Sequence, residues 1–153
     1  MEIGLSIDDA QLRSVFTTFE RPTSGLMKAI AAYLSDEAKL AIRSQTSPNG
    51  ARFAALSPAY AIRKSKDKNT RRTGILQQSA RLMDSIAAES TEDTATLKTN
   101  RPVGSYDLGA IHQFGAPRRN IPARPFFPIT DGGDLLPDAD EEIRGLISDF
   151  FSL

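Results

Sequence analysis

The chain has 153 residues, of which 40% are hydrophobic and 25% charged, the size and composition of one soluble globular domain. It contains no cysteine, which excludes disulfide bonds and thiolate metal sites. The 19 basic and 19 acidic residues cancel, so the net charge gives no reason to expect binding to nucleic acid or to an anionic membrane.

The charges are unevenly placed along the chain. Residues 43–81 hold nine basic residues and one acid, Asp67, whereas residues 131–142 hold six acids and no base. Opposed charges at separate places indicate either contacts between neighbouring copies or two ordinary solvated faces. No apolar run approaches the roughly 20 residues of a membrane-spanning helix, and a signal peptide pattern is missing, so we expect neither secretion nor membrane insertion.

The first part of the chain predicts a strand followed by two helices. Residues 3–7 alternate apolar and polar side chains, the pattern of a half-buried strand. Apolar spacing then predicts a helix of about three turns that ends before Pro22, because the residue before a proline resists the α conformation. Thr23 or Ser24 can cap a second, longer helix with an apolar stripe that reaches Ile42.

The middle of the chain is basic and rich in turn residues. Residues 47–50 (SPNG) form a turn cluster, and Ser57 followed by Pro58 is a recognised helix start, so a short basic helix is expected there. The stretch KSKDKNTRR at residues 64–72 has no apolar anchor. We therefore expect a flexible basic loop at about residues 63–73 in the isolated protein.

Short elements are predicted for the remainder. Apolar spacing indicates a short helix over residues 75–86, and a hairpin is expected to turn at residues 91–93. Six of the nine prolines lie between residues 102 and 137, so only residues 106–114 of this region are free to be helical. Proline and four acids at residues 137–142 suit the start of a terminal amphipathic helix.

Together these elements predict a single α+β domain over residues 1–153. Its small antiparallel sheet is expected to pack with the long N-terminal helix and with the C-terminal amphipathic helix. Isolated glycines such as Gly74 lack the lysine spacing of a phosphate-binding loop, so we interpret them as turns.

His112 is the only histidine, and it lies in the segment IHQFG at residues 111–115. A catalytic histidine needs an orienting or nucleophilic partner and a metal site needs several ligands, yet the chain has no HExxH, CxxC or GxSxG motif. We therefore interpret His112 as structural, with ring nitrogens satisfied by backbone or by an interface. No catalytic residue, cofactor or metal is expected, and the acids at residues 138–142 are assigned to the backbone amides of a helix start. Gly115 is interpreted as a helix stop in the left-handed conformation.

Prolines flank Arg124 in the segment IPARPFFP at residues 121–128. Because proline restricts the backbone, Arg124, Phe126 and Phe127 should be held in a fixed extended geometry with little entropy left to lose on binding. Such a segment is either a docking edge or a rigid strand that crosses the core.

The basic residues at 63–72 also fit a different class, a nucleic-acid-binding module, because clustered Lys and Arg release counterions from phosphate. Against this alternative, the segment has no aromatic residue for base stacking beyond Tyr60, and the whole chain is neutral. Binding that weakens steeply with added salt would support it.

Three patches of the sequence resemble the phage virion morphogenesis family, the tail-completion proteins of Mu-like and P2-like phages. The first is SPNG at 47–50 with Phe53, Leu56, Ser57 and Pro58; the second is Ile75 and Leu76 with Ser79, Leu82, Ser85 and Ile86; the third runs from Tyr106 through IHQFG to IPARPF at 121–126. The third patch is the most specific. This chain has Phe53 where the family usually has tryptophan, and Ser79 with Ala80 where it usually has Thr-Gly or Ser-Gly.

The resemblance implies an α+β structural protein without catalysis, which completes the tail or joins the tail to the head. It implies a ring of identical subunits, most simply six, in the tail end or neck of the virion, with assembly in the host cytoplasm. Tail tube, neck or head-completion proteins are the expected partners, with at most an indirect proximity to DNA, and no membrane. We expect the basic residues of this region to complement the charge of acids such as Asp138 on a neighbouring subunit. The residues expected to form subunit contacts are Arg63, Lys64, Lys66, Arg71, Arg72, His112, Gln113, Phe114, Arg124, Phe126 and Phe127.

Overall fold

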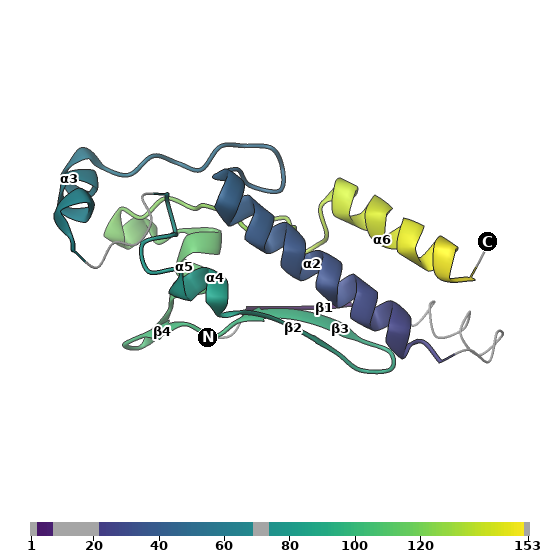
Figure 1. Ribbon diagram of the computed structural model, residues 1–153. Coiled ribbons are helices and arrows are strands. Elements are labelled where there is room, and N and C mark those ends of the chain that lie inside the picture. The colour runs from purple at the N-terminus through teal and green to yellow at the C-terminus, as the bar shows by residue number, and fades with distance from the viewer. Residues whose placement is uncertain (1–2, 8–21, 69–73, 152–153) are drawn as a thin grey trace.

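The computed structural model describes residues 3–7, 22–68 and 74–151 (Figure 1). The helix predicted before Pro22, and the basic residues Arg71 and Arg72, lie outside the described residues. In chain order the elements are β1 (Ile3–Ile7), α2 (Ser24–Ser44), α3 (Pro58–Lys66), α4 (Arg81–Asp84), β2 (Ile86–Ser90), β3 (Ala95–Thr99), β4 (Pro102–Val103), β5 (Tyr106–Asp107), α5 (Leu108–Phe114), the 3-10 helix η1 (Pro117–Arg119) and α6 (Pro137–Phe151).

The strands β1, β3 and β2 form an antiparallel sheet in that order, with β3 in the middle. β2 and β3 are the predicted hairpin, with Ile86 opposite Thr99 and Ser90 opposite Ala95. β3 buries Ala95, Leu97 and Thr99 at alternate positions, so one face of the sheet is turned to the core. The strand predicted at residues 3–7 is confirmed as β1.

α2 crosses the sheet and packs on β2 and β3 (Figure 1). Thr23 holds the N-cap position as predicted, but its hydroxyl does not cap the helix and donates instead to the carbonyl of Glu92 in the hairpin turn. This bond joins the start of α2 to the tip of the hairpin. The buried stripe that faces the sheet repeats at helical spacing and includes Leu26, Ile30, Leu34, Ala38 and Ile42.

α6 runs beside α2 and buries Ala139, Ile143 and Phe151. Phe126 and Phe127 complete the core from the segment after α5; neither is exposed to solvent, and their rings meet edge to face with centroids 4.9 Å apart. The fold is therefore the α+β arrangement that the sequence predicts, an antiparallel sheet with a long helix and a C-terminal amphipathic helix. Among the described residues, no helix is long and apolar enough to cross a bilayer.

The short basic helix predicted through Tyr60 and Lys64 is confirmed as α3, which continues to Lys66 into the stretch expected to be a flexible loop. The Ser57 hydroxyl caps this helix by accepting from the amide of Tyr60. Lys64 is buried, and its Nζ donates to the carbonyl of Gly74 at 2.6 Å. The lysine thus joins α3 to the turn that begins at Gly74.

The predicted helix over residues 75–86 is reduced to the four residues of α4. Residues 74–80 form turns instead, in which Leu76 and Ala80 have φ values of 63° and 59°. Tyr106 and Asp107 form strand β5 instead of a helical turn, because they pair with β4, and α5 begins only at Leu108.

Candidate interface cleft

The segment after α5 is fixed to the core by one amide side chain. Gln113 is buried on α5, and its Oε1 accepts hydrogen bonds from the amides of Phe126 at 3.0 Å and Phe127 at 2.9 Å. α5 itself begins at the N-cap Asp107, whose Oδ1 accepts from the amide of Ala110 at 3.0 Å. The Asp107 carboxylate therefore fixes the start of α5, and the Gln113 amide ties the backbone of Phe126 and Phe127 to this helix.

α5 ends at Gly115, where the chain turns back on itself. The φ of Gly115 is 77°, but its ψ of 173° lies outside the left-handed helical region, so the predicted left-handed stop is wrong in detail. A Cβ atom at this position would lie 2.9 Å from the amide nitrogen of Ala123. Only glycine combines this backbone conformation with so close an approach.

Arg124 is buried, and its guanidinium forms hydrogen bonds within the same chain. Nε donates to the carbonyl of Ala54 at 2.7 Å and Nη2 to the carbonyl of Ala55 at 3.0 Å, while its backbone amide donates to the carbonyl of His112 at 2.6 Å. Burial lowers the pKa of the guanidinium, against an opposing effect of Tyr60. Of the two interpretations of residues 121–128, the structure favours the rigid segment that crosses the core, which forms no regular strand but only the bridge of Ile121 with Ala116.

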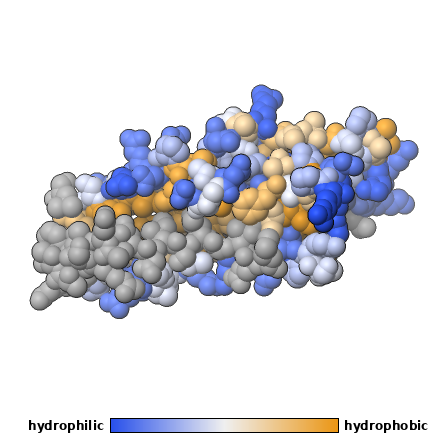
Figure 2. Space-filling model, turned by 180° about the vertical axis from the view of Figure 1, so that it is seen from behind, coloured by the Kyte–Doolittle hydropathy of each residue, from blue (hydrophilic) through white to orange (hydrophobic). Residues whose placement is uncertain are grey.

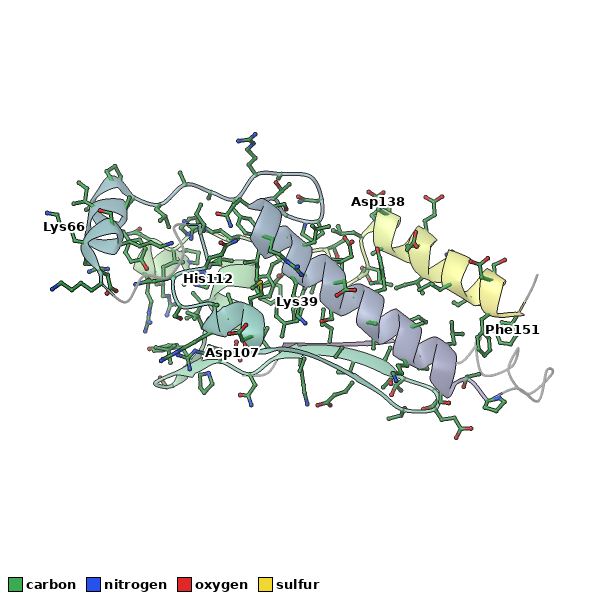
Figure 3. The ribbon with its side chains drawn as sticks, viewed as in Figure 1. Lys39, Lys66, Asp107, His112, Asp138 and Phe151 are labelled. Carbon is green, nitrogen blue, oxygen red and sulfur yellow. The ribbon has the colours of Figure 1, made fainter. Side chains whose placement is uncertain are left out.

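His112 lies on α5 (Figure 3), close enough to this guanidinium to feel its charge. Burial, together with the charge of Arg124, lowers the pKa of the imidazole from 6.5 to about 4, so the ring is neutral at pH 7. Its Nδ1 is buried and has no hydrogen-bond partner among the described residues, so of the two predicted sources of partners, backbone or an interface, the backbone does not satisfy this nitrogen. The described part of the chain also contains no group of three or more side chains able to hold a metal ion.

A cleft of about 1100 Å³ lies beside α3. Its walls are α3 with the residues just before it, the turns around Gln78 with α4, the β4–β5 hairpin with η1, and α5 with the segment at residues 120–124. Its apolar lining includes Leu56, Ile75, Leu76, Leu108, Ile111 and Ile121.

The charged residues that line the cleft are all basic. They are Arg63, Lys64, Arg81, Arg101, Arg119 and Arg124, and no aspartate or glutamate is among the lining residues. The guanidinium of Arg119 lies 3.7 Å from the centroid of the Tyr106 ring, and that of Arg63 lies 5.0 Å from the centroid of Tyr60. A second hollow adjoins the cleft and is bordered by Lys66 and by Asp67, whose carboxylate accepts from Gln78 at 2.8 Å.

The structure brings part of the predicted contact set together. Arg63, Lys64, His112 and Arg124 line the cleft, and Phe114 is 45% exposed at the end of α5. Gln113, Phe126 and Phe127 are buried and present no side chain to a neighbour.

Sequence reasoning missed Arg81, Arg101 and Arg119, since each belongs to a different turn or short element. Two of them lie near a proline, which restricts the backbone: Arg101 directly precedes Pro102, and Arg119 follows Pro117 by two residues. These prolines are the nearest signal in the sequence.

The chain matches the model of a known protein family. The model of the phage virion morphogenesis family matches residues 7–152, nearly the whole chain, including the three patches noted in the sequence. A search of curated proteins and a search of solved structures each found no significant match.

Proposed function

We propose that this chain, which belongs to the phage virion morphogenesis family, completes the tail or joins the tail to the head as one subunit of a ring of identical copies. The family gives the chain a structural role in phage assembly. A ring at the tail end or in the neck would bring it into contact with tail tube, neck or head-completion proteins.

The proposal rests mainly on the exposed apolar side chains around α3. Of the nine residues of α3 only Lys64 is buried, while Ile62 is 57% exposed and Tyr60 37%. Across the cleft, Val103 and Tyr106 are 50% and 45% exposed. In Figure 2, hydrophobic and strongly hydrophilic residues stand side by side at the α3 end of the molecule. Apolar side chains grouped beside charged ones are typical of a surface that another protein covers.

Symmetry makes such a surface useful at the end of a tube. Identical subunits in a closed ring each contribute the same contacts, and many modest contacts add through avidity. In a cyclic ring every subunit presents two different surfaces, one to each neighbour. The cleft is one candidate surface, and the acidic start of α6 is the other.

The proposal is tested by making phage particles without this chain. We expect unjoined heads and tails, or tails of abnormal length, with wild-type assembly restored when the intact gene is supplied in trans. A tagged chain should be located at the tail end or neck by electron microscopy. Normal, infectious particles in the absence of the chain would refute a role in completing the tail.

The basic cleft favours one second candidate, direct binding of DNA. If about four of its cations contact phosphates, affinity should fall roughly 100-fold between about 50 and 200 mM salt. Titration of the purified chain with duplex DNA at both salt concentrations measures this. For an assembly subunit we expect no such salt-sensitive binding.

A further inference from the structure

We propose that the cleft beside α3 receives the acidic start of α6 from a second copy of the chain, so that copies associate head to tail. This inference rests on the proposed ring and names the two surfaces that would form it. We define the acidic patch as Glu37 and Leu40 on α2 with Asp138, Glu141 and Glu142 on α6, two helices that pack together and whose acids Glu37, Asp138 and Glu142 all act on Tyr33.

The acidic patch is outward-facing and concentrated. α6 turns Ala139 and Ile143 toward the core, which leaves Asp138, Glu141 and Glu142 exposed. Within the described ranges these three carboxylates form no ion pair, whereas the neighbouring Asp140 is bound to Arg144.

The effect on Tyr33 shows that the negative charge gathers at this place. Burial, followed by the charges of Glu37, Glu142 and Asp138, raises the pKa of this phenol to about 12. Acids of α2 and of α6 therefore lie close enough together to act on the same phenol. Leu40, on the same helix as Glu37, is 52% exposed and adds an apolar side chain to the patch.

The cleft offers the complementary features. Arg63, Arg81 and Arg119 are exposed and Arg101 is half-buried, and none of the four pairs with a carboxylate in the part of the chain that the structure describes. Guanidinium groups bind carboxylates in a bidentate geometry, and the apolar lining of the cleft suits a side chain such as Leu40.

Figure 3 shows that the two surfaces lie well apart on one molecule, with Lys66 of α3 at one end and Asp138 at the start of α6, alongside α2. A single folded copy therefore does not join them. Two different surfaces that fit each other produce a heterologous contact, which closes into a ring when the rotation between copies permits.

A second copy fits the cleft better than DNA does. Apolar residues make up much of the lining, and a phosphate backbone would leave them uncovered, whereas Leu40 beside acids matches apolar residues beside arginines. Because the chain has a net charge of zero, two copies do not repel each other overall.

The absence of cysteine permits a direct test by disulfide trapping. Chains carrying Ser79→Cys, in the cleft lining, and Glu141→Cys, on α6, are mixed and oxidised, with a size tag on one of them. We expect a disulfide-linked heterodimer. The matched control replaces Glu141→Cys with Glu92→Cys, an exposed acid in the hairpin turn. A yield from the S79C and E141C mixture no higher than from the S79C and E92C mixture overturns the inference.

Charge exchange tests the complementarity. Reversal of the cleft by Arg63→Glu with Arg81→Glu, or of the patch by Glu141→Lys with Glu142→Lys, should each weaken self-association at least about tenfold, measured by sedimentation. The chain with all four changes should regain association, because the charges again match. Lys28→Glu, an exposed change elsewhere on α2, should have no effect.

The possible failures are distinguishable. If either reversal leaves association unchanged, or if the four changes together fail to restore it, the head-to-tail contact is overturned while the chain can still be required for complete tails. If particles form normally without the chain, the proposed function fails, whatever the trapping experiment gives.

Discussion

Acidification should destabilise the folded chain through one residue, His112. The pKa of this imidazole is about 4 in the folded chain, against 6.5 for an exposed histidine, because the ring is buried beside Arg124. Between these values the unfolded chain binds a proton that the folded chain does not. Stability from this residue is therefore fully present above about pH 6.5 and is lost progressively as the pH falls toward 4.

The expected magnitude follows from the difference in pKa. Each pKa unit corresponds to 1.36 kcal/mol, so a change from 6.5 to about 4 costs about 3 kcal/mol of unfolding free energy at low pH. Since domains of this size are stable by roughly 5–15 kcal/mol, the loss is a large share of the total.

Urea unfolding followed by circular dichroism at several values between about pH 7 and pH 4.5 measures the loss. Carboxylates also titrate at the lower end, so the informative quantity is the difference between the wild-type chain and His112→Gln, which has no titrating ring. Because there is one histidine, its imidazole resonances give the folded pKa directly by NMR. A ring that titrates near 6.5 in the folded chain, or parallel pH curves for the two proteins, would refute the reasoning.

Three further substitutions probe α5 and the segment that carries Arg124, each followed by urea unfolding. Arg124→Met removes two charged hydrogen bonds and should cost about 2–4 kcal/mol, and it should raise the pKa of His112, which an unchanged histidine titration would contradict. Gln113→Leu leaves two buried amides without their acceptor and should cost about 2–4 kcal/mol; an effect below about 1 kcal/mol would argue against this role. Gly115→Ala should cost about 2–3 kcal/mol because of positive φ and a close backbone contact, whereas the control Gly145→Ala, in open space on α6, should be neutral or stabilising.

The elements that sequence predicts correctly are those whose signal is local. The apolar stripe of α2, the hairpin at residues 86–99 and the proline-and-acid start of α6 all depend on spacing within one segment. The errors occur where a distant partner decides the structure. The helix through Lys64 was predicted, but its burial was not: the carbonyl of Gly74 receives its ammonium group, and no spacing rule within residues 64–72 shows that contact.

The same reason explains how much of the cleft was predictable. The basic character of α3 is visible in the sequence, and Arg63 was predicted as a contact residue. Arg81, Arg101 and Arg119 come from separate turns, and only the tertiary fold brings them to one cleft. The Arg124 side chain was expected at a docking edge, but its hydrogen-bond partners, Ala54 and Ala55, lie about 70 residues away in the chain.

The segment that makes the sequence recognisable therefore builds the cleft more than it lines an interface. Gln113 fixes Phe126 and Phe127 in the core, and Arg124 then reaches across to the carbonyls that precede α3. This series of contacts positions one wall of the cleft against the other, while the exposed arginines supply its charge. Substitutions at these buried residues should therefore change self-association only to the extent that they change the free energy of unfolding. Charge reversal at the exposed arginines should alter association while the unfolding free energy stays nearly constant.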